Sequence, residues 1–353
     1  MSKDSQAGSQ EPHLLDKPLD RVWLRLDFNP VEMGFAPLSL QVLVAGRPAP
    51  VDLYLPIADV KRRRVEMKLA CPQGKTFLAA WRERLMRRGQ RQVFVSLDQG
   101  PALMEYFDRY SDEIVDAPGI TLKQRAVVVR ELAAVNLRLM FASDLTPKAL
   151  EGSVARAQQT VERLARESQI LTNLTAVLRS DYSVYTHSVN VCMLAMAFGR
   201  YLDLPPSRIH SLGVGGLLHD VGMARLPAAI LDKPGPLNAE ERALVRRHPV
   251  LGHRLLLPVG AVPYDVLMIV RHHHENADGS GYPDRLSADK TPYLARLLRV
   301  VDAYDAMTSR RPYQDARPPF EAAAALIQAM SDQFGGDIVP AFIRFLGSPA
   351  FRG

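Results

Sequence analysis

The sequence predicts a small α+β domain followed by an all-α helical bundle. At 353 residues the chain is long enough for two domains, each with its own core. Between Arg21 and Tyr110 apolar side chains mostly alternate with polar ones, which is the period of β-strands. Beyond Pro118-Gly119 their spacing becomes helical. Eight of the nine histidines lie in this second part, and only His13 lies before it. Because histidine is a common metal ligand and acid–base group, we expect metal or acid–base chemistry there.

Composition favours a protein of the cytosol. Hydrophobic residues make up 47% and charged residues 23% of the chain, as in ordinary globular proteins. Two distant cysteines, Cys71 and Cys192, exclude a disulfide scaffold and suit a reducing compartment. The N-terminus lacks the apolar core of a signal peptide, and no apolar run approaches the roughly 20 residues of a membrane span. We therefore expect a cytoplasmic protein without a membrane span, whose net charge of +6 suits an anionic ligand.

Four segments are expected along the chain. They are a polar, disordered N-terminus (1–19), an α+β domain of regulatory or sensory type (20–112), a helical linker (113–180) and a histidine-rich helical domain (181–353). The apolar spacing of the linker allows two interpretations. It forms a dimer seam or lever, or it packs against the last domain as further helices.

In the first domain short apolar runs predict strands and one amphipathic stretch predicts a helix. The strands are expected at 22–28, 40–44, 51–55, 65–69 and 92–97, and the helix at 77–88, ending at Gly89. Basic residues gather in this half, at Lys61–Arg64 and again between Arg82 and Arg91. They form either a solvated face or a site for an anion, a nucleotide or an acidic partner, and the sequence leaves both open.

The last domain places histidines and aspartates on helices joined by short loops. The predicted helices, with their candidate ligands, are Tyr185–Tyr201 (His187), Pro206–Leu218 (ending at His219-Asp220), a helix starting at Asn238 (His248), Val266–His274 (His273, His274) and Tyr293–Met307 (Asp302). Two further apolar helices are expected at 320–330 and 338–346. Imidazole and carboxylate are common transition-metal ligands, and buried aspartates need a cation. We expect the ligands to meet in the bundle core as a two-metal site.

These residues resemble the HD-GYP family, a branch of the HD phosphohydrolases whose members hydrolyse the bacterial second messenger cyclic di-GMP. The resemblance is carried by His187, His219-Asp220, His248, His273-His274-Glu275, Asp278-Gly279, Gly281-Tyr282-Pro283, Asp302 and Asp305. It covers about Ser180 to Leu346 and implies an HD-type helical bundle there. It says nothing of residues 1–110.

The resemblance implies two divalent metal ions. The first would be held by His187, His219, Asp220 and Asp302, and the second by His248, His273 and His274, with Asp220 shared between them. Glu275, Asp278 and Asp305 would hydrogen-bond and orient the ligands. Some family members hold a third metal through a glutamate where this chain has Ser183, so two metals are expected. Iron or manganese is favoured, while imidazole-rich sites also accept zinc, nickel and cobalt.

The implied reaction is hydrolysis of cyclic di-GMP to linear pGpG, with GMP as a further product. A hydroxide held between two metals attacks phosphorus in line, while the cations take up charge that develops on the phosphate oxygens. Asp220 and Arg311 would be catalytic, since the planar guanidinium of Arg311 can grip phosphate with two hydrogen bonds. Tyr282 and Gly281 would join Arg311 in binding the substrate.

Two positions depart from the family pattern. The lysine that usually lies near the scissile phosphate, four residues after the first HD residue, is Met223 here, and a basic residue three positions after Arg311 is Gln314. Because a thioether cannot neutralise phosphate, a second interpretation is a cyclic-dinucleotide receptor that signals without cleaving. A third is a hydrolase of another cyclic dinucleotide. Implied partners are diguanylate cyclase (GGDEF) domains, bound through the Gly281-Tyr282-Pro283 turn, and a second copy in a homodimer. No nucleic acid polymer is expected.

Overall fold

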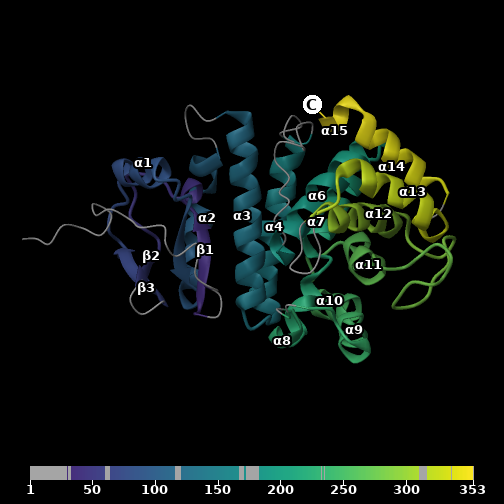
Figure 1. Cartoon of the computed structure of the whole chain (residues 1–353), viewed down its shortest axis with the longest axis horizontal. Coiled ribbons are helices and arrows are strands. Elements are labelled where there is room, and N and C mark those ends of the chain that lie inside the picture. The colour runs from purple at the N-terminus through teal and green to yellow at the C-terminus, as the bar shows by residue number, and fades with distance from the viewer. Residues whose placement is uncertain are drawn as a thin grey trace, which may run out of the picture. The chain divides into compact units, whose positions relative to one another are not determined.

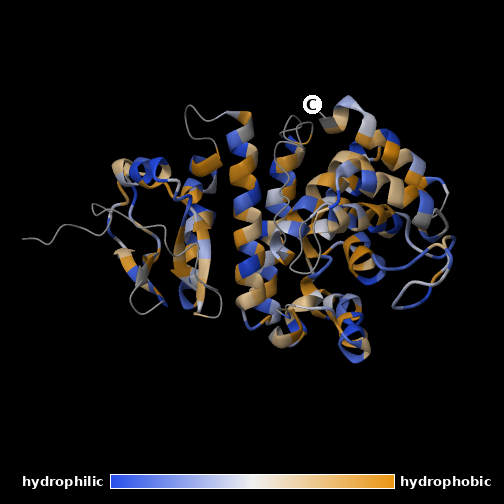
Figure 2. Ribbon diagram, viewed as in Figure 1, coloured by the Kyte–Doolittle hydropathy of each residue, from blue (hydrophilic) through white to orange (hydrophobic). Residues whose placement is uncertain are grey.

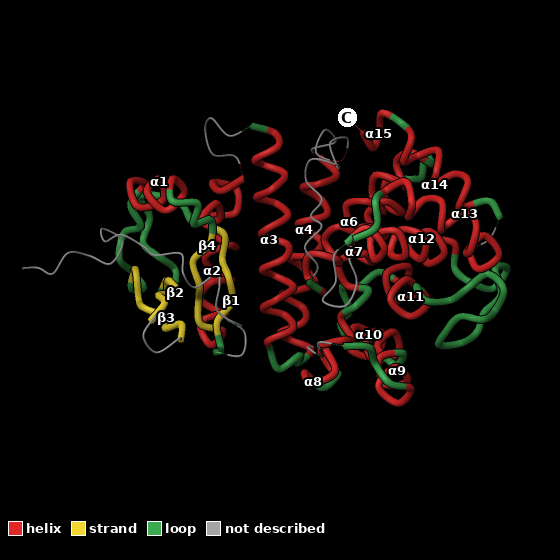
Figure 3. Tube along the Cα trace, in the orientation of Figure 1, coloured by secondary structure: helices red, strands yellow, loops and turns green. Residues whose placement is uncertain are grey.

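The computed structural model describes Pro30, residues 33–59, 64–115, 121–166, Leu171, 183–231, Lys233, 235–309, 316–334 and 336–352. The chain divides into two compact units, residues 1–118 and 119–353. Figures 1 and 3 show that the described strands all lie in the first unit, while the second consists of helices and loops. This confirms the predicted fold class. The four-segment division of the chain stays a prediction.

The first unit contains one antiparallel sheet with strand order β1-β4-β2-β3. Its described elements are β1 (Phe35–Ser39), η3 (Leu40–Val42), β2 (Leu53–Asp59), β3 (Arg64–Cys71), α1 (Ala79–Arg87), β4 (Gln92–Ser96), η4 (Leu97–Gln99) and α2 (Gly100–Val115). The strands predicted at 51–55, 65–69 and 92–97 are confirmed, as is helix α1, which is followed by Gly89 in the left-handed region. The run at 22–28 and the basic residues Lys61–Arg63 lie outside the described residues.

The strand predicted at 40–44 is wrong. Strand β1 ends at Ser39, whose side chain accepts a hydrogen bond from the backbone N–H of Gln41 and starts a 3-10 turn. Leu40 and Val42 remain fully buried within this turn. The alternation of apolar residues that predicted a strand here therefore comes from a 3-10 turn. A period of two in the sequence does not distinguish such a turn from a strand. Helix α2 was not predicted at all.

The second unit is a helical bundle. Its described elements are α3 (Leu122–Ala142), α4 (Pro147–Arg166), α6 (Val184–Tyr201), α7 (Pro206–Leu218), η6 (Val221–Arg225), α8 (Ala228–Leu231), α9 (Ala239–Val245), α10 (His248–Leu256), α11 (Tyr264–His272), α12 (Tyr293–Thr308), α13 (Pro319–Phe334), α14 (Ile338–Gly347) and α15 (Pro349–Arg352). Helices α3 and α4 pack against α6 and α7 in this unit, which favours the second interpretation of the region before the histidines. None of the helices described is long and apolar enough to cross a membrane.

Helix α6 is the central element of the bundle. Every residue from His187 to Gly199 is buried, and α6 packs against α7 and α12. A helix that is apolar on all sides belongs in a core, and hydrophobic colour runs along α6 and α7 in Figure 2. The few polar side chains buried on α6, His187 and Asn190 among them, must therefore find partners inside the bundle.

One predicted helix is in fact two. Asn238 caps a helix as predicted, with Glu241 completing the capping box, but this helix (α9) ends at Val245 and His248 begins α10. Pro249 explains the break, because its ring would clash with the carbonyl of the residue four positions earlier, Val245. The break leaves the Val245 carbonyl free, and the His248 imidazole takes it as an acceptor.

Candidate metal centre

Residues from five helices meet in the core of the second unit. Three groups of side chains offer ligand atoms within 4.8 Å of one another: His187, His219 and Asp302; His248, His273 and His274; and His219, Asp220 and His273. All seven side chains that the sequence assigned as ligands are thus brought together. We call His187, Asp302 and the adjoining Asp305 the carboxylate end, and His248, His273 and His274 the imidazole end.

At the carboxylate end one imidazole lies between two carboxylates. His187 Nε2 is 3.1 Å from Asp302 Oδ1, and its Nδ1 donates to Asp305 Oδ2 at 2.7 Å. Asn190 and Ser309 donate to Asp305 in turn, so its carboxylate is fixed. Burial alone would lower the pKa of His187, but the hydrogen bonds to Asp302 and Asp305 outweigh burial and raise the pKa to about 10. The other side of Asp302 faces His274 Nδ1 at 3.9 Å.

Three imidazoles are oriented by backbone carbonyls. His219, His248 and His273 each donate from Nδ1 to the carbonyl three residues earlier, at 2.8, 2.7 and 2.9 Å. Because carbonyl oxygens only accept, the proton of each neutral ring is on Nδ1 and the lone pair is on Nε2. Such bonds fix ring orientation in metal sites. These carbonyl partners were not predicted from the sequence, because the only signal for them was that a helix ends close to each histidine.

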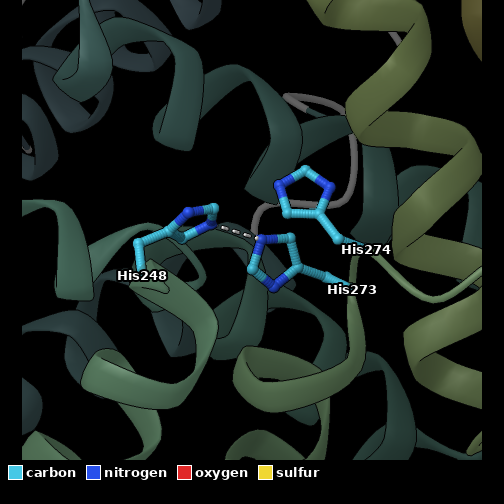
Figure 4. A group of neighbouring side chains, drawn as sticks. All are labelled: His248, His273 and His274. Carbon is cyan, nitrogen blue, oxygen red and sulfur yellow. Dashed lines mark hydrogen bonds between the residues drawn. The ribbon is translucent and has the colours of Figure 1, made fainter. Parts of the chain in front are cut away.

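The lone pairs of the imidazole end point at each other. His248 Nε2 and His273 Nε2 are 3.1 Å apart, as Figure 4 shows. Two neutral rings oriented in this way have no proton to share, so the contact is repulsive unless a cation lies beside both nitrogens. Burial, followed by the neighbouring His219 and His248, lowers the pKa of His273 to about 3, which disfavours a proton as that cation. The donor set therefore fits a divalent metal ion.

Asp220 lies between His219 and the imidazole end. Its Oδ1 is 3.2 Å from His248 Nε2, and its Oδ2 is 3.4 Å from His219 Nε2. Burial opposes its charge, but His219 and His248 outweigh burial and hold its pKa well below the usual range. Gly222 permits this placement, because a Cβ there would lie 2.0 Å from the backbone oxygen of His248. Only glycine lets η6 approach α10 so closely.

The loop after α11 covers the imidazole end. Gly281 lies against the backbone of the preceding turn, and a Cβ on it would be 2.2 Å from Asn276 N. Tyr282 then stacks on His274, with ring centroids 4.7 Å apart and planes inclined by 29°. This stack places Tyr282 beside the predicted ligands. Gly281 contributes close packing of the loop.

Two residues expected to orient imidazoles have other partners. Glu275 accepts from the backbone N–H groups of Asp284 and Leu286, at 2.6 and 3.0 Å, and so closes the loop. Asp278 accepts from the backbone and hydroxyl of Ser280 within its own turn. The structure therefore brings Asp305 to a predicted ligand and leaves Glu275 and Asp278 in the loop.

A fourth group of metal-ligating types, His272, Glu275 and Asp284, lies in the same loop. Both of its carboxylates are already engaged, because Asp284 makes two hydrogen bonds of 2.8 Å to Arg271 and Glu275 holds the loop backbone. We therefore treat this group as a structural support of the loop.

Of the positions that depart from the family pattern, Ser183 has a structural role of its own. Ser183, in place of a glutamate, accepts from Thr186 N at 3.1 Å and caps α6. Met223 is half-buried in η6, one turn after Asp220. Arg311 and Gln314 lie outside the described residues.

Two arginines that the sequence did not point to lie near the predicted site. Arg246 lies beside Tyr282, and Arg299 lies beside Asp302.

Comparison with known proteins agrees with this geometry. A family profile described as HD domain matches residues 150–338. A cyclic di-GMP phosphodiesterase of Pseudomonas aeruginosa is 39% identical over 197 residues, covering 55% of this chain and 47% of that protein. A 3'3'-cGAMP-specific phosphodiesterase of Vibrio cholerae is 40% identical over 130 residues, covering 36% and 25% of the two chains.

A solved structure, an HDG"Y"P protein from Bdellovibrio bacteriovorus, superposes with a TM-score of 0.63 at 20% identity. The superposition covers 89% of this chain and all of that one, and at this identity it bears on the fold alone. The chain spans about half the length of the first curated relatives that it matches.

Proposed function

Because the chain belongs to the HD-GYP branch of the HD-domain family, we propose that its second unit hydrolyses a phosphodiester bond of cyclic di-GMP. The product is linear pGpG, with GMP as a further product. One observation carries the proposal: seven histidine and aspartate side chains converge in three overlapping groups, and Asp220 lies near both His219 and His248. Two adjacent cation sites that share a carboxylate are the arrangement that phosphodiester hydrolysis uses.

We assign His187, His219, Asp220 and Asp302 to one cation, and His248, His273 and His274 together with Asp220 to the other. Iron or manganese suits this mixture of imidazole and carboxylate, while zinc, nickel and cobalt are alternatives. When bound, the two cations supply Lewis acidity that activates water and neutralises charge on the phosphate.

The protein's own groups prepare this centre. Backbone carbonyls keep the Nε2 lone pairs of His219, His248 and His273 directed inward, so little reorganisation is needed when cations bind. Tyr282 covers one face of His274 and restricts water there. Arg311 remains the proposed phosphate-gripping residue, on the sequence resemblance alone.

The test is turnover by purified protein loaded with each metal in turn under reducing conditions. We expect cyclic di-GMP to be cleaved fastest with iron or manganese. No turnover with any metal would sink the enzyme proposal. Tight binding measured by calorimetry, without product, would instead support a receptor.

A second substrate, 3'3'-cGAMP, is favoured by the relative of that name. The proposed cations would contact phosphate and not the bases, so the metal centre by itself would accept either cyclic dinucleotide. Comparison of kcat/KM for the two substrates decides between them, and a ratio above about tenfold, or about 1.4 kcal/mol of differential transition-state binding, would establish a preference.

We further propose that the protein acts in the cytoplasm and that the Gly281-Tyr282-Pro283 turn binds diguanylate cyclase domains. The loop between α11 and α12 that carries this turn is largely hydrophilic in Figure 2, as suits a reversible contact. Pull-down of a GGDEF domain by the parent chain and by a Tyr282→Ala variant would test this. Equal recovery would contradict a role for the turn. Light scattering would test the proposed homodimer.

A further inference from the structure

A cyclic dinucleotide carries two phosphates, and a metal centre that cleaves one of them leaves the other to be neutralised by the protein. A cation of the protein beside the metal centre would neutralise this second phosphate. Two arginines of known position, Arg246 and Arg299, lie near the predicted ligands. They differ in what their guanidinium groups already contact.

Arg299 is committed to the protein. Its Nε donates to Asn276 Oδ1 at 3.2 Å, one terminal nitrogen lies 3.9 Å from Asp302 Oδ2, and its guanidinium packs on the Phe334 ring. Its side chain is 17% exposed. Arg299 thus balances the charge of Asp302 and has little freedom to bind a ligand.

Arg246, unlike Arg299, is not committed to hydrogen bonds or ion pairs with described residues. It is exposed at the end of α9, and its guanidinium makes no hydrogen bond or ion pair with any residue that the structure describes. Its Cζ lies 5.3 Å from the centroid of the Tyr282 ring. Tyr282 in turn stacks on His274, so Arg246 is one aromatic ring away from the imidazole end.

The contact with Tyr282 also prepares Arg246 for binding. A guanidinium that lies over an aromatic ring has fewer rotamers to lose, and its N–H donors stay available at the edge of the plane. A planar group with paired donors matches two oxygens of a phosphate. Because the Tyr282 ring lies between Arg246 and His274, we place Arg246 beside the metal centre rather than in it.

We propose that Arg246 binds the non-scissile phosphate of the cyclic dinucleotide. This inference rests on the proposed function, since it needs a substrate with two phosphates. It assigns Arg246 to substrate binding, and Tyr282 becomes the support that positions it.

The neighbouring Arg247 is a matched control. It is exposed, carries the same charge and lies in the same turn, but it makes no ring contact with the residues that the structure describes. We would compare Arg246→Gln, Arg246→Lys and Arg247→Gln in the full chain. Binding of cyclic di-GMP is measured by calorimetry, and turnover is measured with cyclic di-GMP and with bis(p-nitrophenyl) phosphate, which has a single phosphate.

We expect Arg246→Gln to weaken binding and raise KM for cyclic di-GMP by roughly tenfold to a hundredfold, the range for a charge-assisted phosphate contact. The loss on bis(p-nitrophenyl) phosphate should be several-fold smaller. Arg246→Lys should recover part of the loss, and Arg247→Gln should resemble the parent.

Equal losses for Arg246→Gln and Arg247→Gln would overturn the proposal, because a general charge effect would explain both. Equal losses on the two substrates would also overturn it, since Arg246 would then act at the metal centre. An inactive parent that binds cyclic di-GMP through Arg246 would sink the enzyme proposal and leave the phosphate site standing. A parent that neither binds nor cleaves would remove both.

Discussion

The two ends of the cluster hold their histidines by opposite means. At the carboxylate end His187 contacts Asp302 and Asp305, and these anions raise its pKa to about 10 in spite of burial. At the imidazole end burial and neighbouring rings lower the pKa of His273 to about 3, and the anchors are neutral backbone carbonyls. Imidazole supplies the ligand atoms in both cases. The surroundings decide whether an imidazole binds a proton readily, as His187 does, or resists one, as His273 does.

This difference predicts unequal cation sites. The carboxylate end brings its own negative charge, so a cation there is stabilised even when it is alone. The imidazole end depends on the shared Asp220 for charge, because its three rings are neutral. We therefore expect the carboxylate end to bind its metal more tightly. The following variants break or sharpen this comparison.

The largest effect is expected from Asp220→Ala, because this carboxylate contacts one proposed ligand of each cation, His219 and His248. Without it neither cation has its shared anion, so the metal content should fall from about two ions per chain to almost none, and activity should vanish. His219→Ala should behave similarly. Elemental analysis of the purified variants is the measurement. Two metals retained per chain in Asp220→Ala would contradict the assignment.

A smaller, one-sided effect is expected from Asp305→Asn. This substitution weakens the hydrogen bond that orients His187 and removes one charge from the carboxylate end. Metal affinity there should fall by roughly tenfold to a hundredfold, as for other supporting carboxylates. Metal titration should then show one weakened site and one unchanged.

The matched control is Asp289→Asn, in which an exposed carboxylate that accepts from Ser287 is changed. It should leave both sites unaltered. If Asp305→Asn emptied the imidazole end as well, the two ends would not be independent and the comparison would fail.

The sequence predicted the residues of the cluster better than their surroundings. His187, Asp220 and Asp302 could be assigned because buried acids and imidazoles on apolar helices have few alternative explanations. Their anchors could not, since a carbonyl acceptor is present at every position of the chain. The break between α9 and α10 shows the limit. Pro249 was visible, but only the structure shows that the carbonyl it frees becomes the partner of His248.

The first unit was harder to predict for the same reason. A period of two is produced by a strand and, at 40–42, by a 3-10 turn whose apolar residues are equally buried. In the first unit the alternation of apolar residues was the only guide to the elements, because no chemical motif supported it. The role of this unit therefore stays a regulatory or sensory proposal.

A further variant, Gly281→Ala, tests whether the loop after α11 affects the imidazole end without affecting the carboxylate end. Its Cβ would meet backbone atoms at 2.2 Å, which cannot move aside as a flexible side chain could. We expect a loss of about 3 kcal/mol in the free energy of unfolding, at the upper end for overpacking. The displaced Tyr282 should weaken the imidazole end only. Thermal melting with and without metal is the measurement.

Gly279→Ala is the control for Gly281→Ala. At Gly279 the backbone has φ +76° and the nearest atom to an added Cβ is 3.6 Å away. It should cost only about 1 kcal/mol of backbone strain, without an effect on metal binding. Equal effects of the two variants would show that close packing at Gly281 is unimportant.

The smallest effect is expected from Met223→Lys. Met223 is half-buried in η6, so a lysine could extend toward solvent and add a positive charge near the site. If phosphate lacked a cation, this charge would improve kcat/KM by roughly tenfold to a hundredfold. Because Arg311 is expected to supply this cation, we predict a change below about threefold. Steady-state kinetics of Met223→Lys and Arg311→Ala decide the matter. A neutral Met223→Lys beside a severely impaired Arg311→Ala means that the role of the lysine has moved to Arg311. A large gain from Met223→Lys would mean that the scissile phosphate still lacks a partner, and Arg311 would then not explain how this chain grips it.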